Sequence, residues 1–172
     1  MVTVDGRAAI VGHSSGSIDV IETVSGQVRR RLVHPGGCSD LTLTPDGRRL
    51  VSAGGDHSAL VWGMRLRDVP LTAELKRETN ALKLWERVGQ ADADIAYLAM
   101  ARLAADPTAA LKIARLRMKT WSVADVVAEV RAVELLEALD TPDSRAFLKE
   151  LAAGDPDAIR TREASAAMFR LR

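Results

Sequence analysis

The fold is decided by residues 34–62, which read HPGGCSDLTLTPDGRRLVSAGGDHSALVW. When the chain is shifted by 41 positions, residues 3–7 (TVDGR) fall on residues 44–48 (TPDGR), and Ser17 falls on Ser58. Both copies place an Asp-Gly pair between short runs of β-type residues, which is the composition of a tight turn between two strands. An internal repeat with a period of roughly 40 residues, built from strands and turns, is typical of a β-propeller blade.

The composition of the chain changes abruptly near residue 64. Residues 1–64 hold 10 of the 12 glycines, no lysine and 4 alanines, whereas residues 65–172 hold 23 alanines and 2 glycines. Glycine turns between Val, Ile and Leu runs favour sheets, and Ala, Leu, Glu, Lys and Arg favour helices. We therefore predict an α+β chain with a sheet region over residues 1–64, a linker over 65–74 and a helical region over 75–172.

Six short strands are expected in the first region. The apolar runs are separated by turn pairs at spacings of about ten residues, which predicts an antiparallel meander without helical crossovers. The predicted strands cover residues 8–11, 18–21, 28–33, 41–44, 49–52 and 59–62.

The second copy resembles a repeat of the WD-repeat family of β-propellers. It has His34 near its start, Ser52 on a strand, Asp56 in a tight turn and Trp62 at the end of a strand. The resemblance implies a network that locks the blade, in which Asp56 accepts from His34, His34 meets Ser52, and Ser52 meets the indole N–H of Trp62. The repeat departs from the family pattern at its end, where Gly63 replaces the usual Asp.

The first copy is degenerate, because Val11, Ser15 and Ile21 occupy the network positions. The two repeats, about residues 1–33 and 34–63, amount to roughly one and a half blades, and a propeller needs at least four. We therefore expect the C-terminal part of a larger WD-repeat protein, with the missing blades in the same longer chain. Two alternatives stay open: a small α+β unit in which the sheet packs on the helices, and a propeller assembled from several chains.

In the helical region, capping residues and helix-stopping residues indicate where each helix begins and ends. We predict helices over residues 75–88, from Asp92, from Asp106-Pro107, from Ser122 and Asp125, from Thr141-Pro142 and over 160–171. Short connections predict antiparallel hairpins, which stack into α-solenoids. Residues 84–172 resemble the HEAT-like helical repeats that follow the propeller in planctomycete-type bacterial WD-repeat proteins; a generic helical bundle is the alternative.

No catalytic, metal or cofactor site is predicted. The run Asp56-His57-Ser58 has the residue types of a catalytic triad, but neighbouring side chains of an extended chain point apart, so we interpret it as a turn. The histidines lack the close Cys or carboxylate spacing of a zinc site. Cys38 has no basic neighbour that would lower the pKa of its thiol, so we expect no nucleophilic role.

Two basic runs are interpreted as solvated faces. One is Arg29-Arg30-Arg31 on a strand, and the other comprises Lys112, Arg115, Arg117 and Lys119 on a helix. Neither has an aromatic platform for stacking bases, so we do not expect a nucleic-acid partner. The net charge of +1 gives no global attraction to nucleic acid or membrane.

The sequence favours a non-catalytic scaffold that binds other proteins, because propellers and solenoids bind through shape and exposed loops. The alternative is the regulatory tail of a larger enzyme, such as a kinase or protease, whose catalytic domain is absent from this chain. A decayed gene remnant is a third reading. The start of the chain has no signal-peptide pattern, and no run of about 18 apolar residues occurs, so we expect a cytoplasmic protein.

Overall fold

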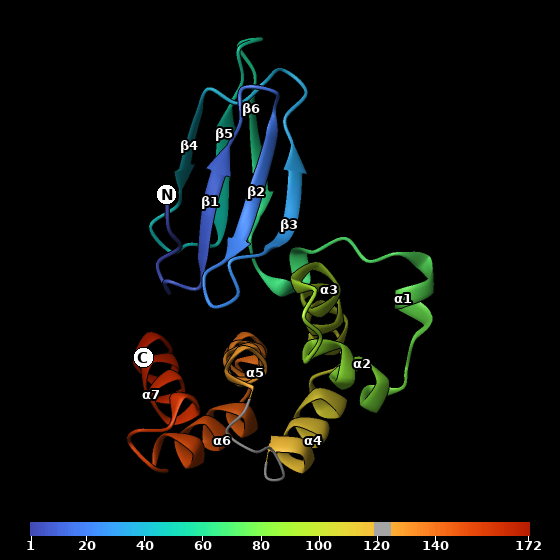
Figure 1. The fold of residues 1–172 in the computed structure, drawn as a ribbon, viewed down its shortest axis with the longest axis vertical. Coiled ribbons are helices and arrows are strands. Elements are labelled where there is room, and N and C mark those ends of the chain that lie inside the picture. Colours follow the sequence, from blue (N-terminus) through green and yellow to red (C-terminus); the bar gives the residue numbers. More distant parts are fainter. Residues whose placement is uncertain (119–124) are drawn as a thin grey trace.

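The computed structural model describes residues 1–118 and 125–172, and its described part holds two small sheets followed by seven α-helices (Figure 1). This confirms the predicted α+β class and the order of the two regions. The strands are β1 (Ala8–Gly12), β2 (Ser17–Glu22), β3 (Val28–Val33), β4 (Asp40–Leu43), β5 (Arg49–Ala53) and β6 (Ala59–Gly63). Each contains or overlaps one of the six strands predicted from the turn chemistry.

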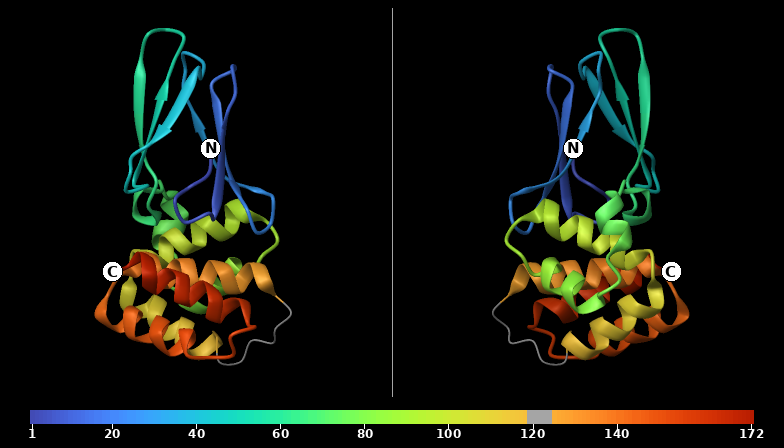
Figure 2. Two further views of the ribbon diagram at one scale, coloured as in Figure 1. Left: turned by 90° about the vertical axis from the view of Figure 1, so that its left-hand side faces the viewer. Right: turned by 90° about the vertical axis from the view of Figure 1, so that its right-hand side faces the viewer.

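The six strands form two three-stranded antiparallel meanders, β1-β2-β3 and β4-β5-β6. In the first sheet the pairing of β2 with β3 shifts in register between Val20 and Ile21. Val2, which precedes β1, forms an isolated bridge with Ala9 of β1. The sheets lie face to face, as the two side views show (Figure 2). Their facing sides form one apolar cluster, made by Ala8, Ile10, Ile18, Val20, Leu32 and Leu50.

The helices are α1 (Ala73–Arg77), α2 (Ala81–Val88), α3 (Ala93–Ala104), α4 (Pro107–Met118), α5 (Val126–Leu139), α6 (Pro142–Ala152) and α7 (Ile159–Arg170). The predicted starts at Asp92, Asp106-Pro107 and Thr141-Pro142 are confirmed within a residue, and α7 lies where the last helix was predicted. Asp125 caps α5 by accepting from the N–H of Ala128, whereas Ser122 lies outside the described residues.

The single helix predicted over residues 75–88 is wrong. The chain forms α1 and α2 instead, and the backbone at Glu78 is extended (φ −69°, ψ 115°). Asn80 explains the break, because its side chain accepts from the N–H of Lys83 and so begins a new helix. The apolar spacing that suggested one continuous helix is compatible with two short ones.

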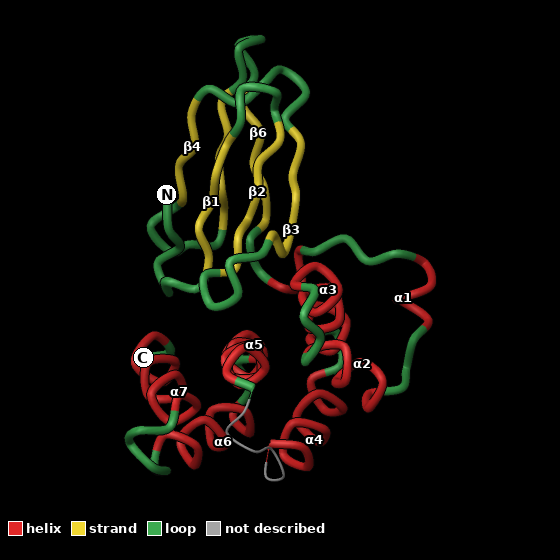
Figure 3. The backbone as a smooth tube through the Cα atoms, in the orientation of Figure 1, coloured by secondary structure: helices red, strands yellow, loops and turns green. Residues whose placement is uncertain are grey.

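The helices after residue 80 form two layers (Figure 3). One layer contains α2, α4 and α6; the other contains α3, α5 and α7 and lies against the end of the first sheet. Consecutive helices pair as hairpins across the layers, as α2 with α3 and α6 with α7. The central helix α5 is buried along most of its length, including Val133, Leu135 and Leu136, so it forms the core of the helical region.

Residues 65–74, expected to be a linker, hold a short 3₁₀ helix, η1 (Leu66–Asp68). Leu66 and Val69 are buried in the same apolar cluster as the helices. The connection is therefore anchored to the helical core immediately after β6 ends. Together with β3, which packs on α3, it fixes the sheets against one layer of helices.

Candidate functional site

His34 lies at the centre of a hydrogen-bonded network between the two sheets. It follows β3, and its Nδ1 lies 2.8 Å from the hydroxyl of Ser52 on β5. The indole N–H of Trp62 on β6 donates to the same hydroxyl over 2.9 Å. His34 and Ser52 are both fully buried, so each polar atom needs the partner that it has.

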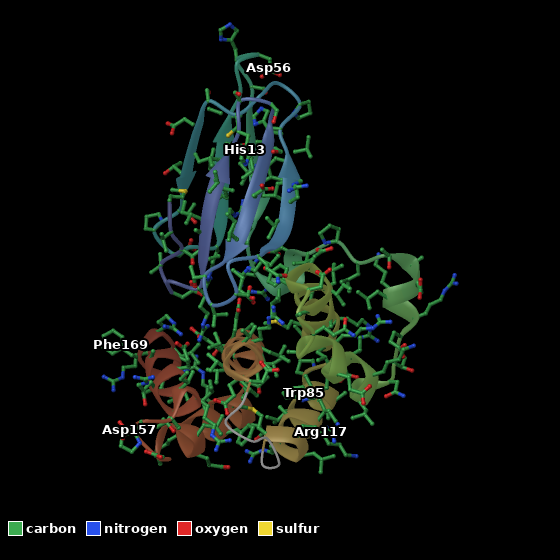
Figure 4. All side chains as sticks on the ribbon, viewed as in Figure 1. His13, Asp56, Trp85, Arg117, Asp157 and Phe169 are labelled. Atoms are coloured by element: carbon green, nitrogen blue, oxygen red, sulfur yellow. The ribbon has the colours of Figure 1, made fainter. Side chains whose placement is uncertain are left out.

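Asp56 does not bind His34 directly, because its Oδ1 lies 3.9 Å from the imidazole Nε2. The hydroxyl of Ser58 lies between them: it donates to Asp56 over 2.6 Å and lies 2.8 Å from Nε2 of His34. The hydrogen bonds from the hydroxyl and the backbone N–H of Ser58 hold the pKa of the Asp56 carboxyl below its ordinary value. Asp56 lies at the end of the sheets that is farthest from the helices (Figure 4).

For a neutral imidazole, one arrangement of protons satisfies the whole network. Ionised Asp56 only accepts, so Ser58 donates to it and accepts from an N–H at Nε2 of His34. The unprotonated Nδ1 then accepts from Ser52, which accepts from Trp62. The hydrogen bonds therefore run in one direction, from Trp62 through Ser52, His34 and Ser58 to Asp56. Such a chain of five residues fixes the relative positions of β5, β6 and the loop after β3.

Ser58 is the network residue that the sequence analysis missed. The signal for it was local, since Asp56 accepts from the backbone N–H of Ser58 two residues later, as in an Asx turn. Glycines leave room for the carboxyl group: a Cβ at Gly54 would lie 2.6 Å from Oδ1 of Asp56 and 2.5 Å from Nε2 of His34.

The geometry does not form a catalytic triad. In the sequence run Asp56-His57-Ser58, the middle residue adopts a positive φ of 65° and lies exposed in the turn. The imidazole that reaches Ser58 belongs to His34, and Asp56 contacts Ser58, not the imidazole that would act as base. In a catalytic triad the carboxylate hydrogen-bonds to the histidine, and the histidine removes the proton of the serine. Here the carboxylate of Asp56 binds the serine hydroxyl directly, so it orients that hydroxyl and does not activate it.

A second polar cluster joins the first sheet to the helices. Arg131 of α5 is 1% exposed, and its Nε and Nη2 each donate over 2.8 Å to the two carboxylate oxygens of Glu22 on β2. Its Nη1 donates to the carbonyls of Val88 and Gln90 at the end of α2. One guanidinium therefore joins three elements of the chain: α5, β2 and the end of α2.

Glu22 remains ionised in this environment. Burial would raise the pKa of its carboxyl, but hydrogen bonds from Arg131 and Ser25 and the nearby positive charges outweigh burial, so the pKa lies below its ordinary value. Because the carboxylate and the guanidinium are both planar, a bidentate pair fixes the orientation of each group relative to the other.

Three further ion pairs extend the cluster along α5 and onto α7. Arg29 of β3 donates to both oxygens of Glu134, at 2.9 and 3.1 Å, and its guanidinium lies 4.5 Å above the ring of Tyr97. Arg7, in the turn before β1, donates to Glu137 over 2.6 Å and to Glu163 over 3.2 Å.

These pairs correct the interpretation of residues 29–31 as a solvated face. Arg29 is 5% exposed, because its guanidinium binds Glu134 of α5 and lies over the ring of Tyr97 on α3. Arg30 donates to the carbonyl of Gly63, and Arg31 pairs with Asp19 on the exposed face. On α4, Arg115 pairs with Glu150 and stacks on Phe147, while Lys119 lies outside the described residues.

Neither cluster has the composition of a metal centre. Within the described residues, no group of three or more His, Cys, Asp and Glu side chains is arranged to hold a metal ion. Burial and the nearby Asp40 raise the pKa of the Cys38 thiol, which disfavours the nucleophilic thiolate.

The chain matches no family model, and no curated protein matches its sequence. None of the helices in the described part of the chain has the length and apolar character needed to cross a bilayer.

Proposed function

We propose that this chain is a non-catalytic scaffold that binds other proteins, and that its two sheets are neighbouring blades of a WD-repeat-type propeller. The blades that complete the propeller belong to the same longer protein, and the helices form a HEAT-like region packed against it. The chain of hydrogen bonds through His34, Ser52 and Trp62 supports this proposal, because a blade of that family is locked by these residue types.

The open edge of β6 is the observation that carries the proposal. Among the described strands, β6 has a single neighbour, β5. The N–H of Gly54 donates to Ser58, and the N–H of Met64 donates to Arg48, so even-numbered residues of this strand bond to β5. The backbone groups of Ala59 and Val61 therefore point away from the sheet, in position to bind another strand.

The outer faces of both sheets also carry exposed apolar side chains. Val11 and Val33 lie on the face of the first sheet that points away from the second, and they are 40% and 59% exposed. Val61 lies on the opposite outer face and is 58% exposed. Exposed valines on both outer faces, beside an open strand edge, favour further sheets packed on either side.

The test compares the isolated chain with the native protein, captured by an antibody against the helical region. We expect a native species heavier than the 18.6 kDa of this chain, in which the amides of Ala59 and Val61 exchange slowly with deuterium. In the isolated chain the same amides should exchange fast. Native material of 18.6 kDa with fast exchange at both amides would refute the proposal.

A matched pair of variants tests the edge itself. Val61→Lys places a charge on the outer face of β6, whereas Leu116→Lys makes a similar change on an exposed position of α4, where the side chain is 63% exposed. We expect the β6 variant to lose the slow exchange of the native assembly and the α4 variant to keep it.

A further inference from the structure

Arg30 reaches from the first sheet to the open edge of the second. It lies on β3 and pairs in register with Val20, whose side chain belongs to the apolar cluster between the sheets. Because residues directly opposite each other in a sheet share a face, the side chain of Arg30 also points toward the second sheet. Its Nη1 donates to the carbonyl oxygen of Gly63, the last residue of β6, over 2.7 Å. An arginine of one sheet therefore binds the edge that the other sheet leaves open.

The guanidinium of Arg30 fills the place that a neighbouring strand would take beside Gly63. The carbonyl of Gly63 points away from β5, because the even-numbered residues of β6 make the hydrogen bonds to β5. The N–H of an added strand would lie about 2.9 Å from this oxygen, and its backbone about 4.8 Å from β6. Nη1 of Arg30 already occupies that position. A strand and the guanidinium therefore compete for the same space.

Asp68 closes the same end of the edge from another side. A Cβ at Gly63 would lie 2.5 Å from Cβ of Asp68, so η1 packs directly on the backbone of Gly63. Asp68 is held in place by Arg65, whose backbone N–H and Nε donate to its carboxylate over 3.2 and 3.1 Å. Ala59 and Val61, nearer the start of the strand, are exposed. The accessible part of the edge is thus limited to these two residues.

We propose that Arg30 determines the register of the strand that completes the second sheet, so that this strand pairs with Ala59 and Val61 and ends before Gly63. The inference rests on the proposed function, which assigns that strand to the longer protein. Ala59 and Val61 each offer one N–H and one C=O to the added strand, so the pairing is short. Charged side chains at an open edge limit its pairing with other strands, which is the role that Arg30 has here.

The test is residue-resolved hydrogen–deuterium exchange of the outward-pointing amides of β6 in the native longer protein. In the unmodified protein we expect slow exchange at Ala59 and Val61 and fast exchange at Gly63. Arg30→Ala frees the carbonyl of Gly63 and lets the pairing extend, so the Gly63 amide should exchange at least about tenfold more slowly. A merely stabilising role of Arg30 predicts the opposite change, because losing a stabilising contact makes amides exchange faster.

Two variants made in the same full-length gene serve as controls. Arg30→Lys keeps a charged donor at this position, so the Gly63 amide should remain in fast exchange. Arg31→Ala removes the neighbouring arginine, which pairs with Asp19 and is 61% exposed, and should leave Gly63 unchanged. Slow exchange at Gly63 in the unmodified protein, or no slowing in Arg30→Ala, overturns this inference while the proposed function stands. Fast exchange at the other two outward-pointing amides refutes the proposed function and this inference together.

Discussion

Arg131 and Glu22 form a bidentate ion pair between two residues that lie 109 positions apart in the chain. Arg131 belongs to the central helix of the helical region, and Glu22 ends the middle strand of the first sheet. Arg131, Glu134 and Glu137 follow one another at intervals of three residues on α5 and bind Glu22, Arg29 and Arg7 of the sheet region. The sheets and the helices are therefore joined by charges, in addition to apolar packing.

Removing Arg131 should destabilise the whole chain. Arg131→Ala leaves Glu22 buried without its counter-charge, and breaking a buried pair in this way costs about 3–5 kcal/mol of unfolding free energy. Urea denaturation followed by circular dichroism measures the difference. Arg48→Ala is the control, because its side chain is 64% exposed, and its unfolding curve should match the unmodified chain. A loss below about 1 kcal/mol for Arg131→Ala would show that the pair contributes little.

The same pair predicts how stability depends on pH. The pKa of Glu22 is lower in the folded chain than its ordinary value of 4.5, so the stabilisation is present above that value and is lost as the pH falls through the folded pKa. Burial also acts on Glu137, but Arg170 and Arg7 outweigh it and lower the pKa of that carboxyl too, so both groups act in the same direction.

Comparison with Glu22→Gln isolates this effect. The unfolding free energies of the two chains should differ most near neutral pH, and the difference should shrink at pH values below 4.5. Urea denaturation at a series of pH values provides the measurement. A difference that stays constant from neutral to acid conditions would mean that the ionised form of Glu22 is not what stabilises the fold.

Local signals in the sequence were enough to place most elements. The Asp-Gly and Gly-Gly turns located the strands, and the caps at Asp92 and Thr141 located the starts of α3 and α6. The prediction of one helix over residues 75–88 was wrong because the spacing of apolar residues does not reveal a break in a helix. The signal for the break was Asn80, which caps the second helix. Three of the four predicted network residues are linked by hydrogen bonds, and Asp56 joins them through Ser58.

The junction between the sheets and the helices could not be predicted in the same way. Arg29 and Glu134 are 105 positions apart, and neither residue has a local sequence pattern that distinguishes it from a solvated charge. Arg29 is buried because β3 packs on α3 and its guanidinium reaches Glu134 of α5. A long-range ion pair leaves no periodic pattern in a single sequence, so burial of these charges follows from tertiary packing alone.

The network around His34 makes a prediction about Ser52. Ser52→Ala leaves the indole N–H of Trp62 without an acceptor and Nδ1 of His34 without a donor. Both atoms lie beside the fully buried position of Ser52. A loss of about 1–3 kcal/mol in unfolding free energy is expected from an unsatisfied buried polar group. Ser39→Ala removes an exposed hydroxyl and should cost less. Equal losses for the two variants in urea denaturation would argue against a structural role of the network.

Two glycines that both have a positive φ provide the last prediction. Gly16 (φ 93°) and Gly26 (φ 71°) both adopt a left-handed conformation that costs an alanine roughly 1–2 kcal/mol. Their surroundings differ, because a Cβ at Gly16 would overlap the carbonyl oxygen of His34, whereas nothing lies within 4 Å of a Cβ at Gly26. Gly16 also accepts from the backbone N–H of His34 over 2.8 Å, so displacing it would move the residue at the centre of the network. Thermal unfolding should therefore show a clearly larger loss for Gly16→Ala than for Gly26→Ala. Equal losses would mean that the positive φ alone determines both losses of stability, and that the turn between β1 and β2 can move without cost.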